Sequence, residues 1–271
     1  MQGHVPRRRF GQNFLADAHY VERIVAAIDP RPGDHVVEIG PGLAALTGRL
    51  IERAGRIVAI EIDRDLAARL RERFAPERLE LHEADALAFD FASLGGDLRV
   101  VGNLPYNISS PLLFRLADQD AHLRDLHVML QREVVARMTA DPATADYGRL
   151  TVMLQTRFAI ERLFTVPPGA FRPAPKVESA VARLTPLHAR KPPIADATLF
   201  ARIVTAAFGQ RRKTLRNALS ALADAATLEN ASIDPGARGE TLSVGDFVRL
   251  ANVLAAHRQE LPQRHFGEQP S

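Results

Sequence analysis

One stretch of the sequence, VVEIGPG over residues 36–42, constrains the fold of the chain more than any other. Two valines, an acid and an isoleucine run into a Gly-Pro-Gly break, and apolar residues then recur at helical spacing. This pattern predicts a buried strand, a tight turn and a helix. In a parallel sheet the backbone of such a turn leaves room for a cofactor, which makes Gly40 a candidate cofactor-binding residue. A glycine pair alone does not establish a ligand site, because many turns need glycine only for a positive φ.

Acidic residues follow the turn at positions that suit a bound nucleoside. Glu61 ends the strand-like run RIVAIEID, where a carboxylate at the surface edge of the sheet can accept hydrogen bonds from ribose hydroxyls. Asp85 ends a third short strand, within reach of an adenine on that ribose. A dehydrogenase shares these features, but Pro41 removes a backbone N–H that would bind a pyrophosphate. The turn therefore favours a cofactor with a ribose and no phosphate. Glu38 suits a buried acid bonded to backbone as well as it suits a cofactor contact.

The tetrapeptide NLPY at residues 103–106 ends a fourth strand and predicts a specific chemistry. The exocyclic amine of adenine is a poor nucleophile because its lone pair is delocalised into the ring. Two acceptors, the side-chain oxygen of Asn103 and the backbone carbonyl of Leu104, would favour the pyramidal amine that can attack. Pro105 favours an extended backbone at Leu104, and Tyr106 offers a ring on which a base can stack.

Six motifs resemble, in the same order, those of the ribosomal RNA adenine dimethyltransferases. They are FGQNFL at 10–15, VEIGPGLAALT at 37–47, AIEID at 59–63, EADAL at 83–87, GNLPYNISSPLL at 102–113 and FRPAPKVESAV at 171–181. The resemblance covers nearly the whole chain and is nearest to the bacterial small-subunit members. It implies S-adenosyl-L-methionine as methyl donor, dimethylation of the exocyclic amines of two adjacent adenosines in 16S rRNA, and a role in small-subunit biogenesis. It implies no metal.

The resemblance also implies roles for residues that the patterns alone do not define. Asn13 and Leu15, both within FGQNFL, would contact the cofactor together with Asn103. Phe171 is expected to stand out from a proline-rich loop and to sandwich an extruded adenine with the NLPY tyrosine. Ala44 stands where many relatives have a glycine, and we expect it to be tolerated because it keeps the start of the following helix small.

Composition and charge restrict the location and the partners of the chain. At 271 residues it can form one large domain and a smaller one. It has no cysteine, which excludes disulfides and thiolate zinc sites, and it has no apolar run of membrane-spanning length, so we expect a cytoplasmic protein. Residues 151–216 hold 12 basic and 3 acidic side chains, net +9, in a chain of net charge +3. Such a segment favours a polyanionic partner, although a solvated arginine-rich surface has the same charge.

Alternating patterns predict an α/β fold, with a doubly wound sheet and a small C-terminal all-helical domain. The resemblance implies that this sheet is the Rossmann-like doubly wound methyltransferase sheet. We expect strands at 35–39, 56–61, 79–82, 98–102 and 126–131, and a terminal hairpin from the apolar runs 149–158 and 177–185. We expect helices at 43–54, 64–74, 109–117, 132–140, 196–208, 210–223 and 243–257. The chain would then comprise an N-terminal arm (1–16), a methyltransferase domain (17–187) and a helical RNA-binding domain (188–271).

Two groups of cations are candidates for contact with RNA. They are Arg7, Arg8 and Arg9 in the arm, and Arg211, Arg212, Lys213 and Arg216 in the segment 210–223. The expected partner is 16S rRNA within an immature small ribosomal subunit. We expect the protein to be a monomer and not to bind a membrane. Two alternatives remain open. A ribosome-assembly factor could bind the immature subunit with methylation secondary, and a DNA adenine methyltransferase is disfavoured because no separate sequence-reading domain is visible.

Overall fold

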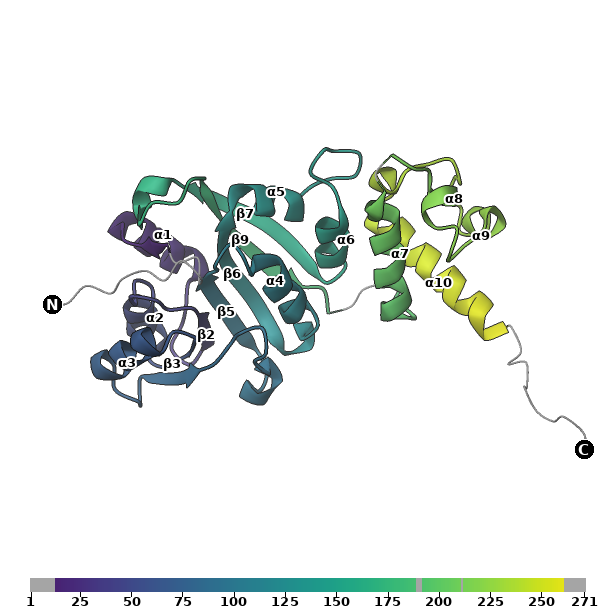
Figure 1. Cartoon of the computed structure of the whole chain (residues 1–271). Helices are drawn as coiled ribbons and strands as arrows, with labels where there is room; N and C mark the ends of the chain where they lie inside the picture. Colours follow the sequence, from purple (N-terminus) through teal and green to yellow (C-terminus); the bar gives the residue numbers. More distant parts are fainter. Residues whose placement is uncertain (1–12, 189–191, 211, 261–271) are drawn as a thin grey trace, which may run out of the picture. The chain divides into compact units, whose positions relative to one another are not determined.

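The computed structural model describes residues 13–188, 192–210 and 212–260, and the chain divides into two compact units (Figure 1). The first unit comprises residues 1–139 and 157–188, and the second comprises residues 140–156 and 189–271. The division after residue 188 lies next to the boundary expected from the sequence. The segment 140–156, which the sequence patterns place in the methyltransferase domain, belongs to the second unit.

The first unit is built on a seven-stranded sheet with the strand order β4-β3-β2-β5-β6-β9-β7. The first five strands in this order are parallel, and β9 is antiparallel to both of its neighbours. The chain runs outward from β2 to β4 and then begins β5 on the other side of β2, so the strand order reverses there. The strands are β2 His35–Ile39, β3 Ile57–Glu61, β4 Leu79–Glu83, β5 Leu98–Asn103, β6 Leu123–Gln131, β7 Phe158–Val166 and β9 Ser179–Pro186.

Helices pack around this sheet, and a separate pair of two-residue strands completes the unit (Figure 1). Val36 of β2 and Val101 of β5 share one hydrophobic cluster with Ile24 and Val25 of α1 and with Leu50 of α2. Because successive side chains of a strand point to opposite faces, the buried residues that alternate with Val36 along β2 and with Val101 along β5 face the other side of the sheet. The doubly wound fold is thereby confirmed. The elements are β1 Phe14–Leu15, β8 Phe171–Arg172, α1 Ala18–Ile28, α2 Thr47–Ala54, α3 Arg64–Arg73, α4 Ser109–Ala117 and α5 Arg132–Met138.

The segment 149–158 is mainly helical, so the prediction of a strand there is wrong. Helix α6, Arg149–Gln155, occupies most of it, and the Gly148 amide donates to the Thr151 hydroxyl at 3.1 Å at the start of this helix. The antiparallel partner of β9 is instead β7, which begins at Phe158. A continuous apolar run lacks the periodicity that separates a buried strand from a buried helix, and this run was therefore ambiguous.

The second unit is helical and has its own hydrophobic core. The expected helix 210–223 is wrong in extent, because only residues 215–218 form an α-helix there. The Leu215 amide donates to the Ala237 carbonyl at 2.8 Å and the Arg216 amide donates to the Pro235 carbonyl at 3.1 Å, so a distant loop satisfies the start of this short helix. The helices of the unit are α6, α7 Ala197–Gly209, α8 Leu215–Ala218, α9 Ala225–Asn230 and α10 Val244–Glu260.

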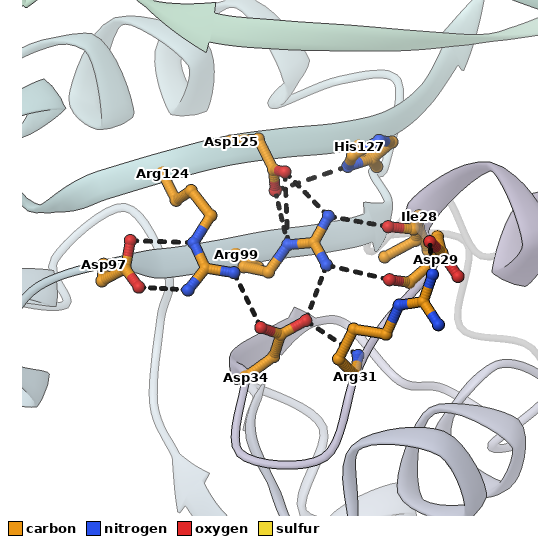
Figure 2. A network of polar contacts seen from close by, with 9 residues as sticks. All are labelled: Ile28, Asp29, Arg31, Asp34, Asp97, Arg99, Arg124, Asp125 and His127. Carbon is orange, nitrogen blue, oxygen red and sulfur yellow. Dashed lines mark hydrogen bonds and ion pairs between the residues drawn. The ribbon is translucent and has the colours of Figure 1, made fainter.

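A network of partly and fully buried charges lies at the amino-terminal edge of the parallel strands (Figure 2). Arg99, near the start of β5, donates to Asp34 and to Asp125, each at 2.8 Å. Its guanidinium also donates to the backbone carbonyl of Ile28 at 2.7 Å and to that of Asp29 at 3.3 Å, at the end of α1. One buried cation therefore joins β5, β6, the residue before β2 and a helix terminus.

A second arginine extends this network toward solvent (Figure 2). Arg124 donates to Asp34 at 2.7 Å and also binds Asp97. Burial raises the pKa of Asp34, but hydrogen bonds from the Arg31 amide and from the Arg99 and Arg124 side chains outweigh it and lower the pKa to about 2. Asp34 is therefore a carboxylate throughout the physiological range, and it holds two arginines in place.

Candidate active site

A pocket opens at the carboxyl edge of the parallel strands, next to the point where the strand order reverses. Doubly wound sheets bind their ligands at this position. The walls come from β1 and from the residues at the ends of β2, β3, β4 and β5. The sequence candidates that line the pocket are Asn13, Leu15, Gly40, Glu61, Asp85, Asn103, Leu104, Pro105 and Tyr106.

The turn after β2 is shaped by residues with left-handed backbone conformations. Gly40 has a φ of 66° and Gly42 has a φ of 59°, which glycine adopts without steric cost. A Cβ at Gly42 would lie 3.0 Å from the Phe14 ring, so a larger residue at this position would force that ring to move. The helix begins at Thr47, which makes residues 43–46 part of the turn.

Ala44 does not lie at the start of a helix, and the explanation given for it from the sequence is therefore wrong. Its φ is 64°, in the left-handed region, and its side chain is buried. A left-handed conformation costs an L-residue other than glycine roughly 1–2 kcal/mol. Ala44 thus stores backbone strain in the turn that borders the pocket, and a glycine would adopt this conformation without that strain.

Glu61 is buried rather than exposed at the edge of the sheet, because only 4% of its surface is accessible. Its two carboxylate oxygens accept hydrogen bonds from the backbone amides of Gly42 at 3.2 Å and Asp63 at 2.9 Å. Burial raises the pKa of Glu61, and these two hydrogen bonds oppose the rise. Glu61 therefore orders the glycine turn as well as facing the pocket. Each carboxylate oxygen can accept a further hydrogen bond, for example from a ribose hydroxyl.

Glu38 is a second buried acid in the pocket wall, with 2% of its surface accessible. Its Oε2 atom has no hydrogen-bond partner among the described residues. Burial raises the pKa of Glu38 to about 7, although the nearby Thr47 hydroxyl opposes the rise. The negative charge of the neighbouring Glu61 adds to the rise. An unpartnered carboxylate oxygen at the wall of a pocket suits a cationic or hydrogen-donating ligand.

Asn103, the last residue of β5, is oriented by the segment that precedes β1. Its Nδ2 atom donates to the backbone carbonyl of Asn13 at 2.9 Å, which leaves Oδ1 as the acceptor that the side chain presents to a ligand. The Leu104 amide donates to the Met129 carbonyl at 3.1 Å, so the backbone after Asn103 is joined to β6. The acceptor that the sequence assigns to adenine chemistry is thus held from two sides.

Tyr106 is half-buried in the pocket wall, and its hydroxyl is bonded to the hydroxyl of Ser179 with an O···O distance of 2.6 Å. Burial raises the pKa of the Tyr106 phenol, so the ring is neutral at physiological pH. The Ser109 hydroxyl donates to the Tyr106 carbonyl at 3.1 Å. The tyrosine is therefore attached at its backbone to α4 and at its tip to β9.

The prediction that Phe171 stands out from its loop is wrong for this structure. Phe171 forms strand β8 with Arg172 and pairs with Leu15 of β1, and its side chain is fully buried in the cluster that includes Val166 and Val181. A proline-rich sequence does not reveal that a two-residue strand pairs with it from the other end of the chain. In this arrangement Phe171 supports β1 and does not face the pocket.

Sequence reasoning missed several pocket residues with apolar side chains, among them Leu43, Ile62 and Phe14. Leu43 and Ile62 line the pocket and are 45% and 46% exposed, although large aliphatic residues of this kind are usually buried. Phe14 also lines the pocket and packs on the glycine turn. Asp85 is exposed beside them and accepts a hydrogen bond from the Leu87 amide at 2.9 Å. The signal available in the sequence was an apolar residue directly after Gly42 and directly after Glu61.

Only some of the cations proposed from the sequence lie within the described residues. Arg212, Lys213 and Arg216, here called the α8 cations, are exposed on the second unit at and before α8. Arg7, Arg8, Arg9 and Arg211 lie outside the described residues. In the part of the chain that the structure describes, no group of three or more histidine, aspartate or glutamate side chains could hold a metal ion. No helix there has both the length and the apolar character needed to cross a bilayer.

Comparison with known proteins identifies relatives of the whole chain. Residues 3–256 match the model of the family described as ribosomal RNA adenine dimethylase. The chain is 60% identical to ribosomal RNA small subunit methyltransferase A of Aromatoleum aromaticum, over 94% of this chain and 97% of that protein. It is also 60% identical to the protein of the same name from Thiobacillus denitrificans, over 93% and 99% of the two chains.

Two solved structures resemble the chain over most of its length. A dimethyladenosine transferase from Plasmodium falciparum has a TM-score of 0.76 and 25% identity, over 88% of this chain and 95% of that chain. The 23S rRNA methyltransferase ErmE has a TM-score of 0.66 and 29% identity, over 90% of this chain and 100% of that chain. The likeness extends over most of the chain in both cases.

Proposed function

Since the chain belongs to the ribosomal RNA adenine dimethylase family, whose members are S-adenosyl-L-methionine-dependent enzymes, we propose that it dimethylates two adjacent adenosines of 16S rRNA on their exocyclic amines. The observation that carries this proposal is the orientation of Asn103, whose amide nitrogen is held by Asn13 so that its oxygen is presented to the pocket. The expected setting is an immature small ribosomal subunit in the cytoplasm. A monomer would suffice, because one chain supplies the pocket.

The residues of the pocket fit S-adenosyl-L-methionine. The unpartnered oxygen of Glu38 suits the cationic part of this ligand, and Glu61 and Asp85 offer acceptors for hydroxyl and amine groups. The exposed side chains of Leu43 and Ile62 provide an apolar surface against which the adenine ring of this ligand would pack. When bound, this donor supplies a methyl group on a positively charged sulfur.

The NLPY residues would then prepare the nucleophile. Asn103 Oδ1 and the Leu104 carbonyl would accept the two hydrogens of the target amine, which localises its lone pair for attack. Tyr106 would stack on the extruded base and hold it against these acceptors. No side chain has to act as a strong base, because the amine nitrogen becomes acidic only as the new bond forms, and its proton can then leave to solvent. A singly methylated base has one remaining N–H and would donate it to one of these two acceptors in the second transfer.

A single-turnover assay of Asn103→Ala tests this role directly. With cofactor and RNA both saturating, we expect the rate of methyl transfer to fall about a hundredfold or more, as for the loss of one oriented hydrogen bond at a transition state. Cofactor and RNA affinities should change much less. Asn230→Ala, at an exposed position on α9, is the matched control and should keep the wild-type rate. A wild-type rate in the Asn103 variant would show that Asn103 does not activate the amine and would contradict the role proposed for NLPY.

We also propose that the second unit binds RNA through the α8 cations. Reversing their charges should weaken RNA binding and reduce the slope of its salt dependence by up to about 0.9 for each phosphate that the protein no longer neutralises. Cofactor affinity should not change. Reversal of three exposed arginines of the first unit that already have carboxylate partners, Arg49, Arg56 and Arg71, serves as the control for net charge. Equal slopes for the two triple variants would show that the α8 cations only form a solvated surface.

A further inference from the structure

The hydroxyl of Ser179 is in an unusual position for a residue outside the pocket wall. Ser179 is fully buried at the start of β9, where it pairs with Gln131 of β6 on one side and with Val166 of β7 on the other. Its Oγ atom lies 2.6 Å from the phenolic oxygen of Tyr106. A short serine side chain on a strand that is paired on both sides has little freedom to move. The hydroxyl is therefore a fixed point within the sheet.

Tyr106, in contrast, lies on the segment between β5 and α4, outside either element. The Ser109 hydroxyl donates to the Tyr106 carbonyl, and the Ile108 amide donates to the Pro105 carbonyl. These two hydrogen bonds hold the main chain of the turn and do not act on the ring. The Ser179 hydroxyl holds the far end of the ring, because it is bonded to the phenolic oxygen. This bond fixes the direction in which the axis of the ring points.

We propose that Ser179 is a positioning residue for methyl transfer, which fixes the Tyr106 ring through the bond between the two hydroxyls. The inference rests on the proposed function, in which this ring carries the target base. Stacking depends on the orientation of the ring, and a base that is tilted with it would leave the acceptor at Asn103. The tether would act on the substrate base, because the ring carries that base. Neither hydroxyl needs to touch the cofactor for this effect.

Removal of either hydroxyl should have the same consequence. Ser179→Ala and Tyr106→Phe each abolish the tether and keep the aromatic ring, so each should lower the single-turnover rate about three- to tenfold, as expected for one hydrogen bond. The double variant should be no slower than either single variant, because both remove one interaction. Ser179→Thr, which keeps the hydroxyl, should recover most of the rate. Thr156→Val removes a buried hydroxyl that binds the Val152 carbonyl and should leave the rate unchanged.

A spectroscopic measurement decides the tether independently of activity. The chain has three tyrosines, so ring-labelled tyrosine gives few NMR signals to assign. Ser179→Ala should shift the Tyr106 ring signals, while those of Tyr147, whose hydroxyl donates to the Leu242 carbonyl, should not change. Unchanged Tyr106 signals, a wild-type rate in Ser179→Ala, or multiplicative effects in the double variant would each overturn the proposal. A wild-type protein that transfers no methyl group would refute the proposed function, and the NMR result would still decide whether Ser179 fixes the ring.

Discussion

Replacement of Arg99 by methionine should destabilise the first unit strongly, because it removes one charge from the network in Figure 2 and keeps only an unbranched apolar stem. The Asp34 and Asp125 side chains are 9% and 14% exposed and would lose their common partner. Breaking a buried ion pair by removal of one partner costs about 3–5 kcal/mol. Since Arg124 still binds Asp34, we expect a loss near the lower end, about 3 kcal/mol.

Hydrogen exchange measures this loss where it occurs. Protection of the β5 and β6 amides should fall by a factor on the order of a hundred, which corresponds to about 3 kcal/mol in the free energy of opening. Arg56→Met is the matched control, because Arg56 forms an ion pair with Glu80 at 2.7 Å between side chains that are 60% and 39% exposed. Such a surface pair contributes no more than about 1 kcal/mol. If the two variants lost equal protection, the buried network would have no special weight.

The same network predicts a dependence of stability on pH. The pKa of Asp34 is lowered to about 2 in the folded protein, from an ordinary value of 3.8. A carboxyl whose pKa is depressed by folding contributes stability above its unfolded pKa, and this stability is lost as the pH falls through the folded pKa. The free energy of unfolding of the wild type should therefore fall by about 2 kcal/mol more than that of Asp34→Asn between about pH 4 and pH 2. Parallel unfolding curves for the two proteins across this range would refute the assignment.

Three further predictions concern the glycine turn and the wall of the pocket. Ala44→Gly should raise the urea midpoint slightly, because relief of roughly 1–2 kcal/mol of strain exceeds the 0.4–1 kcal/mol lost to a more flexible unfolded chain; a lower midpoint would show that the conformation is not strained. Glu38→Gln should stabilise the ligand-free protein by up to about 3 kcal/mol at pH 8, and the gain should vanish toward pH 5, because a pKa raised to about 7 makes folding less favourable as the pH rises above the unfolded pKa. Calorimetry should also show weaker cofactor binding by this variant. An unchanged affinity would contradict contact between Glu38 and the ligand. Glu61→Gln should weaken cofactor binding and increase hydrogen exchange at the Gly42 amide. An amide side chain can accept from only one of the two backbone donors that Glu61 now binds. Unaltered hydrogen exchange would contradict the role of Glu61 in the turn.

Most of the fold and the composition of the pocket were predictable because they depend on local patterns. Buried parallel strands read as short apolar runs, and the strand ends were marked by Gly40, Glu61, Asp85 and Asn103. Parallel strands bring such ends to one edge of a sheet, so the order of elements was sufficient to predict that these residues meet. No contact between distant segments had to be known for this part of the prediction.

The errors lie where a distant segment determines the outcome. The strand β8 at Phe171 depends on pairing with β1, which precedes it by more than half the chain, and no periodicity marks a two-residue strand. The short helix α8 begins where the carbonyls of Pro235 and Ala237 satisfy its first amides. The burial of Glu61 follows from the fold of the glycine turn over it, although its position at a strand end suggested exposure. Local propensity carries no information on such partners.

The two edges of the sheet treat buried charge in opposite ways, and the contrast separates stability from function. At the amino-terminal edge Arg99 meets two carboxylates and two backbone carbonyls, so its charge is neutralised within the fold. At the carboxyl-terminal edge Glu38 retains an oxygen with no partner among the described residues, and Ala44 retains a strained backbone. A fold tolerates such unfavourable groups at a ligand site when favourable interactions elsewhere in the structure offset their free-energy cost. Variants at Arg99 should therefore lower stability without a selective effect on cofactor binding, whereas Glu38→Gln should raise the stability of the ligand-free protein and weaken its binding of the cofactor.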